Sequence, residues 1–246
     1  MSLPVFHHPE LSGVVVGGSV ELSGDEARHA VVVRRIRVGE QVALTDGAGT
    51  TVVAAVTATT KGSLTGTVSE VSQVPCESPR LVVVQAIPKG DRGELAVEML
   101  TEVGADVIVP WAASRSVAVW RGERAAKSLA KWRSTAREAA KQSRRAWFPS
   151  VAEMVGTSGV VDLLRDAALA VVLHEAGSTP LAGLDVPDTG DVVVVVGPEG
   201  GISDEELEAF AAVGGEPLRL GRSVLRTSTA GVAACAALLA RTGRWA

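Results

Sequence analysis

Apolar residues follow two different patterns along this 246-residue chain, one before and one after residue 80. Residues 191–196 read Asp followed by five valines. An apolar run without polar alternation is typical of a strand buried on both faces, as in a parallel sheet covered by helices. From Leu81 onward, strand patterns alternate with helical ones. This alternation predicts an α/β domain built on a parallel sheet.

The expected strands of this domain cover 81–86, 107–109, 168–173, 191–196 and 217–220, and the expected helices cover 91–103, 122–143, 203–213 and 228–241. In the first of these helices Leu95, Met99 and Val103 recur every four residues, and Ala96 and Leu100 extend the same face. We expect this stripe to pack on the sheet.

The first seventy-odd residues have the pattern of small β structure. Short segments rich in Val and Thr are separated by turns that contain Gly, and they cover 14–16, 41–45, 51–59 and 63–74. They predict a compact barrel or sandwich, interrupted by one helix that begins near Ser23. Pro75 and Pro79 enclose a polar linker. The predicted domains are therefore 1–75 and 80–246.

A glycine-rich loop follows the valine strand. Its sequence, residues 197–201, is Gly-Pro-Glu-Gly-Gly, and Ser203 with Glu206 then forms a capping box that starts a helix. This order places the loop at the carboxyl edge of the sheet, where open α/β sheets bind ligands; the alternative is a tight turn with no ligand. There is no G-x-G-x-x-G or G-K-[ST] motif, and Glu199 would repel a phosphate. The expected ligand is therefore not a polyphosphate.

A second loop, within 218–230, begins as a strand and ends as a helix. Between them lies the apolar pair Val224 and Leu225, which can form the walls of a flat pocket that suits an adenine ring. Thr227 or Ser228 is expected to cap the final helix.

Charge is distributed unevenly along the chain. The net charge is -4, yet residues 121–145 hold nine Lys and Arg against two acidic residues. A local excess of this size predicts a surface for a polyanion.

Composition narrows the class of protein. The apolar content of 46% supports a folded core, and apolar runs such as 167–173 are far shorter than the roughly 18 residues of a membrane helix. The amino-terminal residues lack the pattern of a secretory signal, so we expect a cytoplasmic protein without membrane association. Cys76 and Cys235 are far apart, which fits a reducing compartment, and no spacing suggests a metal site.

These motifs together resemble the RsmE family of 16S ribosomal RNA methyltransferases in the SPOUT superfamily. The glycine-rich loop, Leu220-Gly221, and Val224-Leu225-Arg226 followed by Thr229-Ala230 carry the resemblance. Further matches lie outside the loops: His29, Arg34 to Arg37 with Gly39, Lys89-Gly90, Glu102 with Gly104, Gln142 with Arg144, and His174-Glu175.

The resemblance implies a PUA-like amino-terminal barrel that binds RNA and a carboxyl-terminal domain with a trefoil knot. It also implies a homodimer with the active site near the interface. The implied reaction is methylation of N3 of a uridine in 16S rRNA of the small ribosomal subunit, with S-adenosylmethionine as the methyl donor. The residues implied at the cofactor are Leu173, His174, Gly197, Gly200, Gly201, Leu220, Gly221, Val224, Leu225 and Thr229.

The implied chemistry needs help at uridine N3, which is a poor nucleophile until its proton leaves. Arg226 is the candidate to stabilise the uridine anion. Glu199 is a possible base, and a turn-stabilising role is the alternative. His174 either contacts substrate or is a locally bonded loop residue. Ser228 stands where the family often has a glutamate, so the ordering of Arg226 needs another partner here.

Basic and polar residues in three places are the candidates for gripping RNA: Arg34, Arg35, Arg37, Lys89, Arg92, Gln142, Arg144 and Arg145. Trp147 and Phe148 either stack on an unpaired base or belong to the core. Two other functions stay open. One is a SPOUT enzyme that methylates a ribose 2′-oxygen or tRNA, and the other is a ribosome-assembly factor that binds RNA without turnover.

Overall fold

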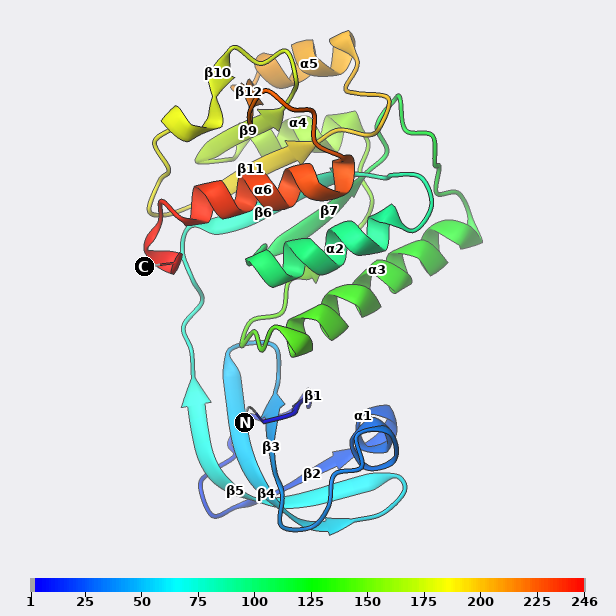
Figure 1. The fold of residues 1–246 in the computed structure, drawn as a ribbon, viewed down its shortest axis with the longest axis vertical. Coiled ribbons are helices and arrows are strands. Elements are labelled where there is room, and N and C mark those ends of the chain that lie inside the picture. Colours follow the sequence, from blue (N-terminus) through cyan, green and yellow to red (C-terminus); the bar gives the residue numbers. More distant parts are fainter. Residues whose placement is uncertain (1–2, 246) are drawn as a thin grey trace. The chain divides into compact units, whose positions relative to one another are not determined.

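A computed structural model describes residues 3–245 of the chain. These residues form two compact units, shown in Figure 1. Residues 3–76 and 140–148 make up unit 1, and residues 77–139 and 149–245 make up unit 2. Residues 140–148 lie within the predicted second domain, 80–246, whereas in the structure this segment folds with unit 1.

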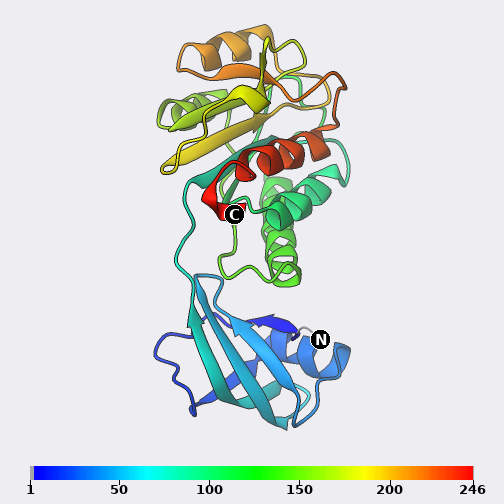
Figure 2. The same cartoon turned by 60° about the vertical axis from the view of Figure 1, so that its left-hand side comes forward.

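Unit 1 is a curled five-stranded sheet (Figure 2). In the spatial order of the sheet its strands are β1 (Val5–His7), β3 (Gln41–Thr45), β4 (Thr50–Thr59), β5 (Ser63–Gln73) and β2 (Ser19–Ser23). β1 runs parallel to β3, and all other neighbours are antiparallel. Alternation buries Val52, Ala54 and Val56 of β4 on the concave side. The predicted small β domain is confirmed.

Two parts of this unit differ from the prediction. Residues 14–16 form a turn in which Val15 and Val16 are exposed, because no strand pairs with them. β1 and β2 were not predicted: the three residues of β1 are too few for a pattern, whereas β2 has a clear alternation, with Val20 and Leu22 buried, that the prediction missed. The expected helix is a short one, α1 (Gly24–Arg28), and continues as a π-helical turn, His29–Val33.

The segment after residue 140 joins unit 1 through the turn between β3 and β4. The amide of Gly49 donates to the carbonyl oxygen of Ala146 at 3.0 Å, and the amide of Phe148 donates to the carbonyl oxygen of Gly47 at 2.9 Å. A Cβ atom at Gly47 would lie 2.7 Å from the Phe148 ring. Glycine in this turn therefore permits the close approach of the segment.

Trp147 takes part in the same contact. Its indole N–H donates to the carbonyl oxygen of Val74 at 2.8 Å, and a Cβ atom at Gly49 would lie 2.8 Å from its ring. Trp147 and Phe148 are half-buried. Their packing on unit 1 favours the core role over base stacking.

Unit 2 contains a sheet of seven strands, all parallel to their neighbours. In spatial order they are β10 (Thr179–Pro180), β12 (Glu216–Arg219), β9 (Leu169–Leu173), β11 (Asp191–Val196), β6 (Arg80–Ala86), β7 (Val107–Trp111) and β8 (Ser150–Val151). The described helices are α2 (Arg92–Val103), α3 (Glu123–Gln142), α4 (Thr157–Arg165), α5 (Asp204–Ala211) and α6 (Thr227–Leu239). The predicted parallel α/β domain is confirmed.

The five valines of β11 divide between two hydrophobic cores. Val192, Val194 and Val196 pack with residues of α2, α3 and α6 on one face of the sheet. Val193 and Val195 pack with residues of α4 and α5 on the other face. Burial on both faces explains why the run contains no polar position.

The expected stripe on α2 is wrong at Leu95, which is 46% exposed. Ala96 and Leu100 of the predicted stripe are buried, and the helix also buries Gly93, Val97 and Thr101. A Cβ atom at Gly93 would lie 2.8 Å from the indole of Trp132 in α3. Gly93 faces inward because the absence of a side chain there permits close packing of α2 on Trp132 of α3.

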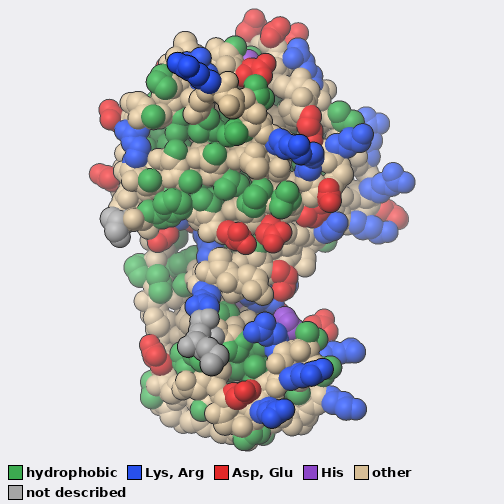
Figure 3. Space-filling view, in the orientation of Figure 1, with side chains coloured by type: hydrophobic (Ala, Val, Ile, Leu, Met, Phe, Trp, Pro, Cys, Tyr) green, Lys and Arg blue, Asp and Glu red, His purple; other side chains and the backbone are tan. Residues whose placement is uncertain are grey.

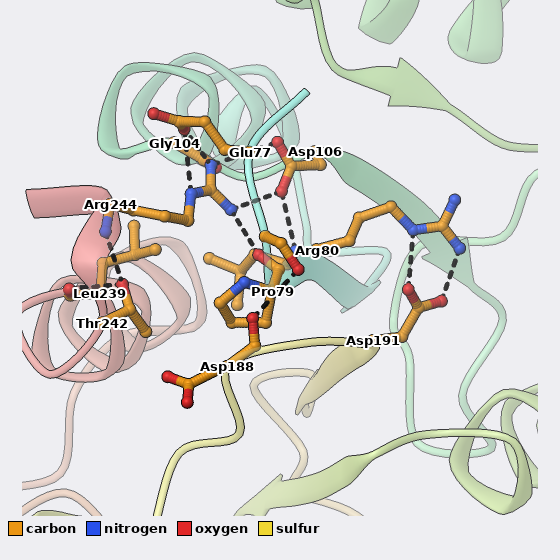
Figure 4. Close-up of polar contacts among 12 residues, drawn as sticks. Glu77, Pro79, Arg80, Gly104, Asp106, Asp188, Asp191, Leu239, Thr242 and Arg244 are labelled. Atoms are coloured by element: carbon orange, nitrogen blue, oxygen red, sulfur yellow. Dashed lines mark hydrogen bonds and ion pairs between the residues drawn. The ribbon is translucent and has the colours of Figure 1, made fainter. Parts of the chain in front are cut away.

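An arginine near the carboxyl terminus ties together several segments of unit 2 (Figure 4). The side chain of Arg244 is 3% exposed and forms an ion pair of 2.6 Å with Asp106 and one of 2.9 Å with Glu77. It also donates to the carbonyl oxygens of Pro79 and Gly104, each at 2.9 Å. This cluster fixes the linker against the start of β7 and the end of α2. Within residues 3–245, no helix has the length and apolarity needed to cross a membrane.

Candidate functional site

The two loops singled out in the sequence enclose one cleft of about 900 Å³ in unit 2. It lies at the carboxyl ends of β9, β11 and β12. Residues 173–176, 196–202 and 218–227 form most of its lining, and Arg92, Arg115 and Ala230 complete it. Its position at the carboxyl edge of a parallel sheet is the usual place for a ligand in such folds.

Most of the predicted site residues of unit 2 line this cleft. They are Leu173, His174, Gly197, Gly200, Gly201, Leu220, Gly221, Val224 and Leu225, with Glu199, Arg226 and Arg92. Thr229 is exposed and does not line the cleft, where Thr227 and Ala230 lie instead. Lys89 is exposed next to the cleft and is also outside its lining.

A hydrogen-bonded chain joins the two loops. The hydroxyl of Thr227 donates to the carbonyl oxygen of Gly197 at 2.8 Å and accepts from the side-chain amide of Gln85 at 2.9 Å. Gln85 is fully buried in β6. The expected capping role is therefore wrong: Arg226 occupies the N-cap position of α6, and no side chain caps it. The Thr227 hydroxyl bonds instead to Gly197 and Gln85, because the fold brings the second loop against the glycine-rich loop and the end of β6.

The glycine-rich loop is shaped by close contacts. A Cβ atom at Gly200 would lie 2.8 Å from the backbone oxygen of Arg115, and one at Gly197 would lie 2.8 Å from the side chain of Ile202. Gly201 has a left-handed φ of 75°. Each of the three glycines is thus required by contact or conformation. Arg115 was not singled out in the sequence, because no local motif marks the loop that carries it.

Glu206 holds that loop in place. Its side chain is buried and accepts from the amide of Ser203 at 3.0 Å, which confirms the predicted capping box. It also accepts from the amide of Ser114 at 2.8 Å and from the hydroxyl of Thr157 at 3.0 Å. Burial alone would raise the pKa of Glu206, but these hydrogen bonds hold its pKa below the ordinary value of 4.5. The ionised carboxylate therefore fixes Ser114, and with it the adjacent Arg115, beside the glycine-rich loop.

Two further predicted residues have local partners. The carboxylate of Glu199 is exposed and accepts from the backbone amide of Lys89 at 3.2 Å. The Nδ1 atom of His174 accepts from the amide of Ala176 at 3.3 Å. These contacts support a loop-ordering role for both side chains, and each still borders the cleft.

The cleft combines apolar walls with positive charge. Val224 and Leu225 are large apolar side chains exposed in the second loop. Five arginines line the cleft against two glutamates: Arg92, Arg115, Arg219, Arg222 and Arg226, with Glu175 and Glu199. An excess of positive charge in a chain of net charge -4 indicates that the cleft receives an anionic ligand beside an apolar one.

The basic run at 121–145 is only partly available to a ligand. Lys131 pairs with Glu94 at 3.0 Å, and Arg133 pairs with Glu153 at 2.9 Å. Figure 3 shows Lys and Arg side chains gathered along the edge of unit 2 that carries α3. Part of the predicted polyanion surface therefore stabilises the fold.

The other predicted RNA-binding residues lie in unit 1. Arg34, Arg35 and Arg37 follow the π-helical turn and are exposed, as are Gln142 and Arg144 at the end of α3. Arg145 is half-buried. The structure brings Arg34, Gln142 and Arg144 to one small cleft of this unit.

Comparisons with known proteins agree with this organisation. A family profile described as an RNA methyltransferase domain matches residues 76–239, and one described as an RNA methyltransferase PUA domain matches residues 22–69. The ribosomal RNA small subunit methyltransferase E of Mycobacterium tuberculosis is 42% identical over 233 residues, which cover 93% of this chain and 89% of that protein.

Solved structures give the same result. Ribosomal RNA small subunit methyltransferase E from Neisseria gonorrhoeae, bound to S-adenosyl methionine, superposes with a TM-score of 0.85 at 29% identity and covers 97% of this chain and 98% of its own. A Legionella pneumophila protein solved with the bound cofactor SAM has a TM-score of 0.88 at 30% identity, with coverage of 98% and 99%. With the methyltransferase profile over most of its length and a relative of 42% identity, the chain belongs to the RsmE family of RNA methyltransferases.

Proposed function

We propose that this protein transfers a methyl group from S-adenosylmethionine to N3 of a uridine in 16S rRNA. The observation that carries the proposal is that both sequence motifs of the family enclose one cleft with apolar walls and a positive rim. The solved relatives that match nearly the whole chain hold S-adenosylmethionine, and the mycobacterial relative is named for methylation of the small-subunit ribosomal RNA.

The residues of the cleft fit this cofactor. Leu173, Leu220, Val224 and Leu225 supply apolar surface of the kind that packs against an adenine ring. The glycine-rich loop lines the cleft and offers no Walker-type phosphate site. When bound, S-adenosylmethionine supplies an electrophilic methyl group on a cationic sulfur.

We assign to Arg226 the role of acting on the uridine. It borders the cleft, and its backbone forms the N-cap of α6, which is tied to the glycine-rich loop through Thr227. A guanidinium beside the base stabilises the anion that forms as the N3 proton leaves. The N3–methyl bond then forms as the sulfur–methyl bond breaks, and the products are the methylated base and S-adenosylhomocysteine.

The proton of N3 leaves to Glu199 or to water. Glu199 borders the cleft but is engaged with the amide of Lys89, so we assign it first a loop-ordering role and second that of a base. The RNA is gripped by cations of both units: Arg34 and Arg144, which are exposed, and Arg92, which is half-buried. A homodimer and a cytoplasmic location, which the family resemblance implies, are part of the proposal.

The test is methylation of small ribosomal subunits from cells that lack this activity, with isotopically labelled S-adenosylmethionine and the purified protein. Mass spectrometry of the nucleosides should show labelled 3-methyluridine, and mapping should place it at one position of 16S rRNA. Label on a ribose or on tRNA would identify a different RNA methyltransferase. Cofactor binding without transfer to subunits or naked rRNA would identify a non-catalytic binding protein.

A further inference from the structure

Unit 1 contains a second cleft, of about 250 Å³, which we call the barrel cleft. Its walls come from separate segments that the fold of this unit brings together: residues 3–6, His29, Arg34, Lys141, Gln142 and Arg144. It shares no lining residue with the larger cleft of unit 2, which we call the methyltransferase cleft. The end of α3 forms one wall because residues 140–148 fold with unit 1.

The charge of the barrel cleft is positive. The side chain of Lys141 is buried and pairs with Glu26 at 2.6 Å, so its charge is compensated and it anchors the end of α3. Arg34 and Arg144 are exposed. Within residues 3–245 their guanidinium groups have no hydrogen-bonded or ionic partner. Two uncompensated guanidiniums beside one cleft favour an anion that accepts several hydrogen bonds.

The backbone of Arg144 adds a second observation. Its φ is 56°, in the left-handed region that favours glycine. The amide of Arg145 donates to the carbonyl oxygen of Ala140 at 2.9 Å, and the amide of Arg144 donates to that of Lys141 at 3.2 Å. This pattern is a Schellman motif, in which the left-handed position is usually glycine. The backbone conformation therefore does not explain an arginine at this position. Its exposed side chain, which borders the barrel cleft, is the part of the residue available to a ligand.

The apolar part of the barrel cleft gives no platform for a base. Phe6 is buried, and the ring of His29 packs edge-on against it, with centroids 5.9 Å apart and an interplanar angle of 86°. Its polar lining instead includes groups that can donate hydrogen bonds: two guanidiniums, the side-chain NH2 of Gln142 and an imidazole nitrogen of His29.

We propose that the barrel cleft binds a phosphate of the RNA backbone, with Arg34 and Arg144 as its two charged ligands and Gln142 and His29 as additional donors. The proposal rests on RNA as the substrate of the proposed function and names where one phosphate of that substrate is held. A contact of this kind fixes the register of the RNA without reading its sequence.

The experiment measures binding of a fluorescent 16S rRNA fragment to the full-length protein by anisotropy at several salt concentrations. Arg144→Gly and Arg34→Ala should each weaken binding, and the double variant should lower the slope of log K against log salt by about one, the value for one phosphate. Arg144→Lys should retain more binding than Arg144→Gly. Arg28→Ala, an exposed arginine of α1 outside the barrel cleft, should bind as the unchanged protein does.

Thermal unfolding separates binding from folding. Arg144→Gly should raise the unfolding temperature because glycine adopts the left-handed conformation at lower cost. A lower unfolding temperature for this variant would show that Arg144 is structural and would overturn the proposal. Unchanged affinity and salt slope in the double variant would overturn it as well.

Inorganic phosphate distinguishes the source of the anion. For an RNA phosphate site, millimolar phosphate should compete with the RNA for the unchanged protein more than for the double variant at equal ionic strength. If inorganic phosphate raises the unfolding temperature of the protein but leaves its affinity for RNA unchanged, the cleft is a site for the free ion and the proposal is contradicted. Methyl transfer by the unchanged protein is measured separately, so failure of the proposed function is recognised independently of the salt slopes.

Discussion

The hydroxyl of Thr227 donates a hydrogen bond of 2.8 Å to the carbonyl oxygen of Gly197. The two residues belong to the two loops that enclose the methyltransferase cleft, and the same hydroxyl accepts from buried Gln85. The start of α6 is thereby fixed to the end of β11 and to β6. This oxygen atom therefore joins the two loops directly and helps to set the geometry of the cleft.

Thr227→Val should weaken both folding and cofactor binding. Valine keeps the shape of threonine but leaves the Gly197 carbonyl without this donor and Gln85 with only its bond to the carbonyl oxygen of Ala86, at a cost of about 1–3 kcal/mol. Calorimetry with S-adenosylmethionine should show roughly tenfold weaker binding. Thr229→Val is the matched control, because the Thr229 hydroxyl bonds only to the carbonyl oxygen of Arg226 on the exposed side of the helix. Equal effects of the two substitutions would contradict the role of Thr227.

Gly200→Ala should disturb the cleft, whereas Gly221→Ala should not. A Cβ atom at Gly200 would meet the backbone of Arg115 at 2.8 Å, and backbone cannot move aside as a flexible side chain can. Overpacking of this kind costs about 1–3 kcal/mol. No atom lies within 4 Å of a Cβ atom built at Gly221 in the same cleft. Chemical denaturation and cofactor titration of the two variants provide the measurement, and loss of stability only in Gly221→Ala would refute the assignment.

Arg226→Ala should slow methyl transfer while leaving cofactor affinity nearly unchanged. Removing a cation that stabilises developing negative charge typically costs a factor on the order of 10² to 10³ in kcat. Because ionisation of uridine N3 then depends on solvent, the rate of the variant should rise more steeply with pH than that of the unchanged protein. Arg222→Ala removes a neighbouring arginine of the same cleft and should affect kcat much less. A fall in affinity for S-adenosylmethionine with normal kcat would show that Arg226 binds the cofactor and does not act on the uridine.

Glu206→Gln should reduce stability at neutral pH by about 1–3 kcal/mol, because a neutral amide replaces a buried carboxylate that accepts three hydrogen bonds. The pKa of Glu206 is lower in the folded state than its ordinary 4.5. Its contribution to stability is therefore present above pH 4.5 and is lost as the pH falls through the folded-state pKa. The difference in unfolding free energy between Glu206→Gln and the unchanged protein should become smaller in this acidic range.

Denaturant unfolding at a series of pH values measures the effect at Glu206. Glu208→Gln, an exposed change on the same helix, should keep the acid profile of the unchanged protein. A constant difference between Glu206→Gln and the unchanged protein down to pH 2 would show that the charge of Glu206 is irrelevant.

Arg244→Ala should destabilise the protein by about 3–5 kcal/mol, because it leaves the carboxylate of Asp106 without its buried partner and two carbonyl oxygens without a donor. Arg165→Ala is the comparison, since its ion pair with Asp162 is exposed and should contribute at most about 1 kcal/mol. Denaturant unfolding checks both values. A cost for Arg244→Ala as small as that of Arg165→Ala would show that the cluster in Figure 4 does not hold the linker.

Local pattern was sufficient to predict much of this fold. The valine run of β11, the capping box at Ser203 and the alternation of strands and helices are confirmed, because periodicity and cap chemistry depend on residues a few positions apart. β1 and β8 were missed, since two or three residues carry too little periodicity to distinguish them from loops. α4 was also missed, although its apolar residues lie on one face and Val160 and Leu164 are buried.

The sequence by itself determined the parallel α/β sheet, the loops at its carboxyl edge and the family to which the chain belongs. Only the tertiary structure decided that residues 140–148 fold with unit 1, that Thr227 bonds to Gly197 and that Glu206 reaches Ser114. These contacts join residues far apart in the chain. Their partners are chosen by which loops meet when the sheet forms, so no local pattern can specify them.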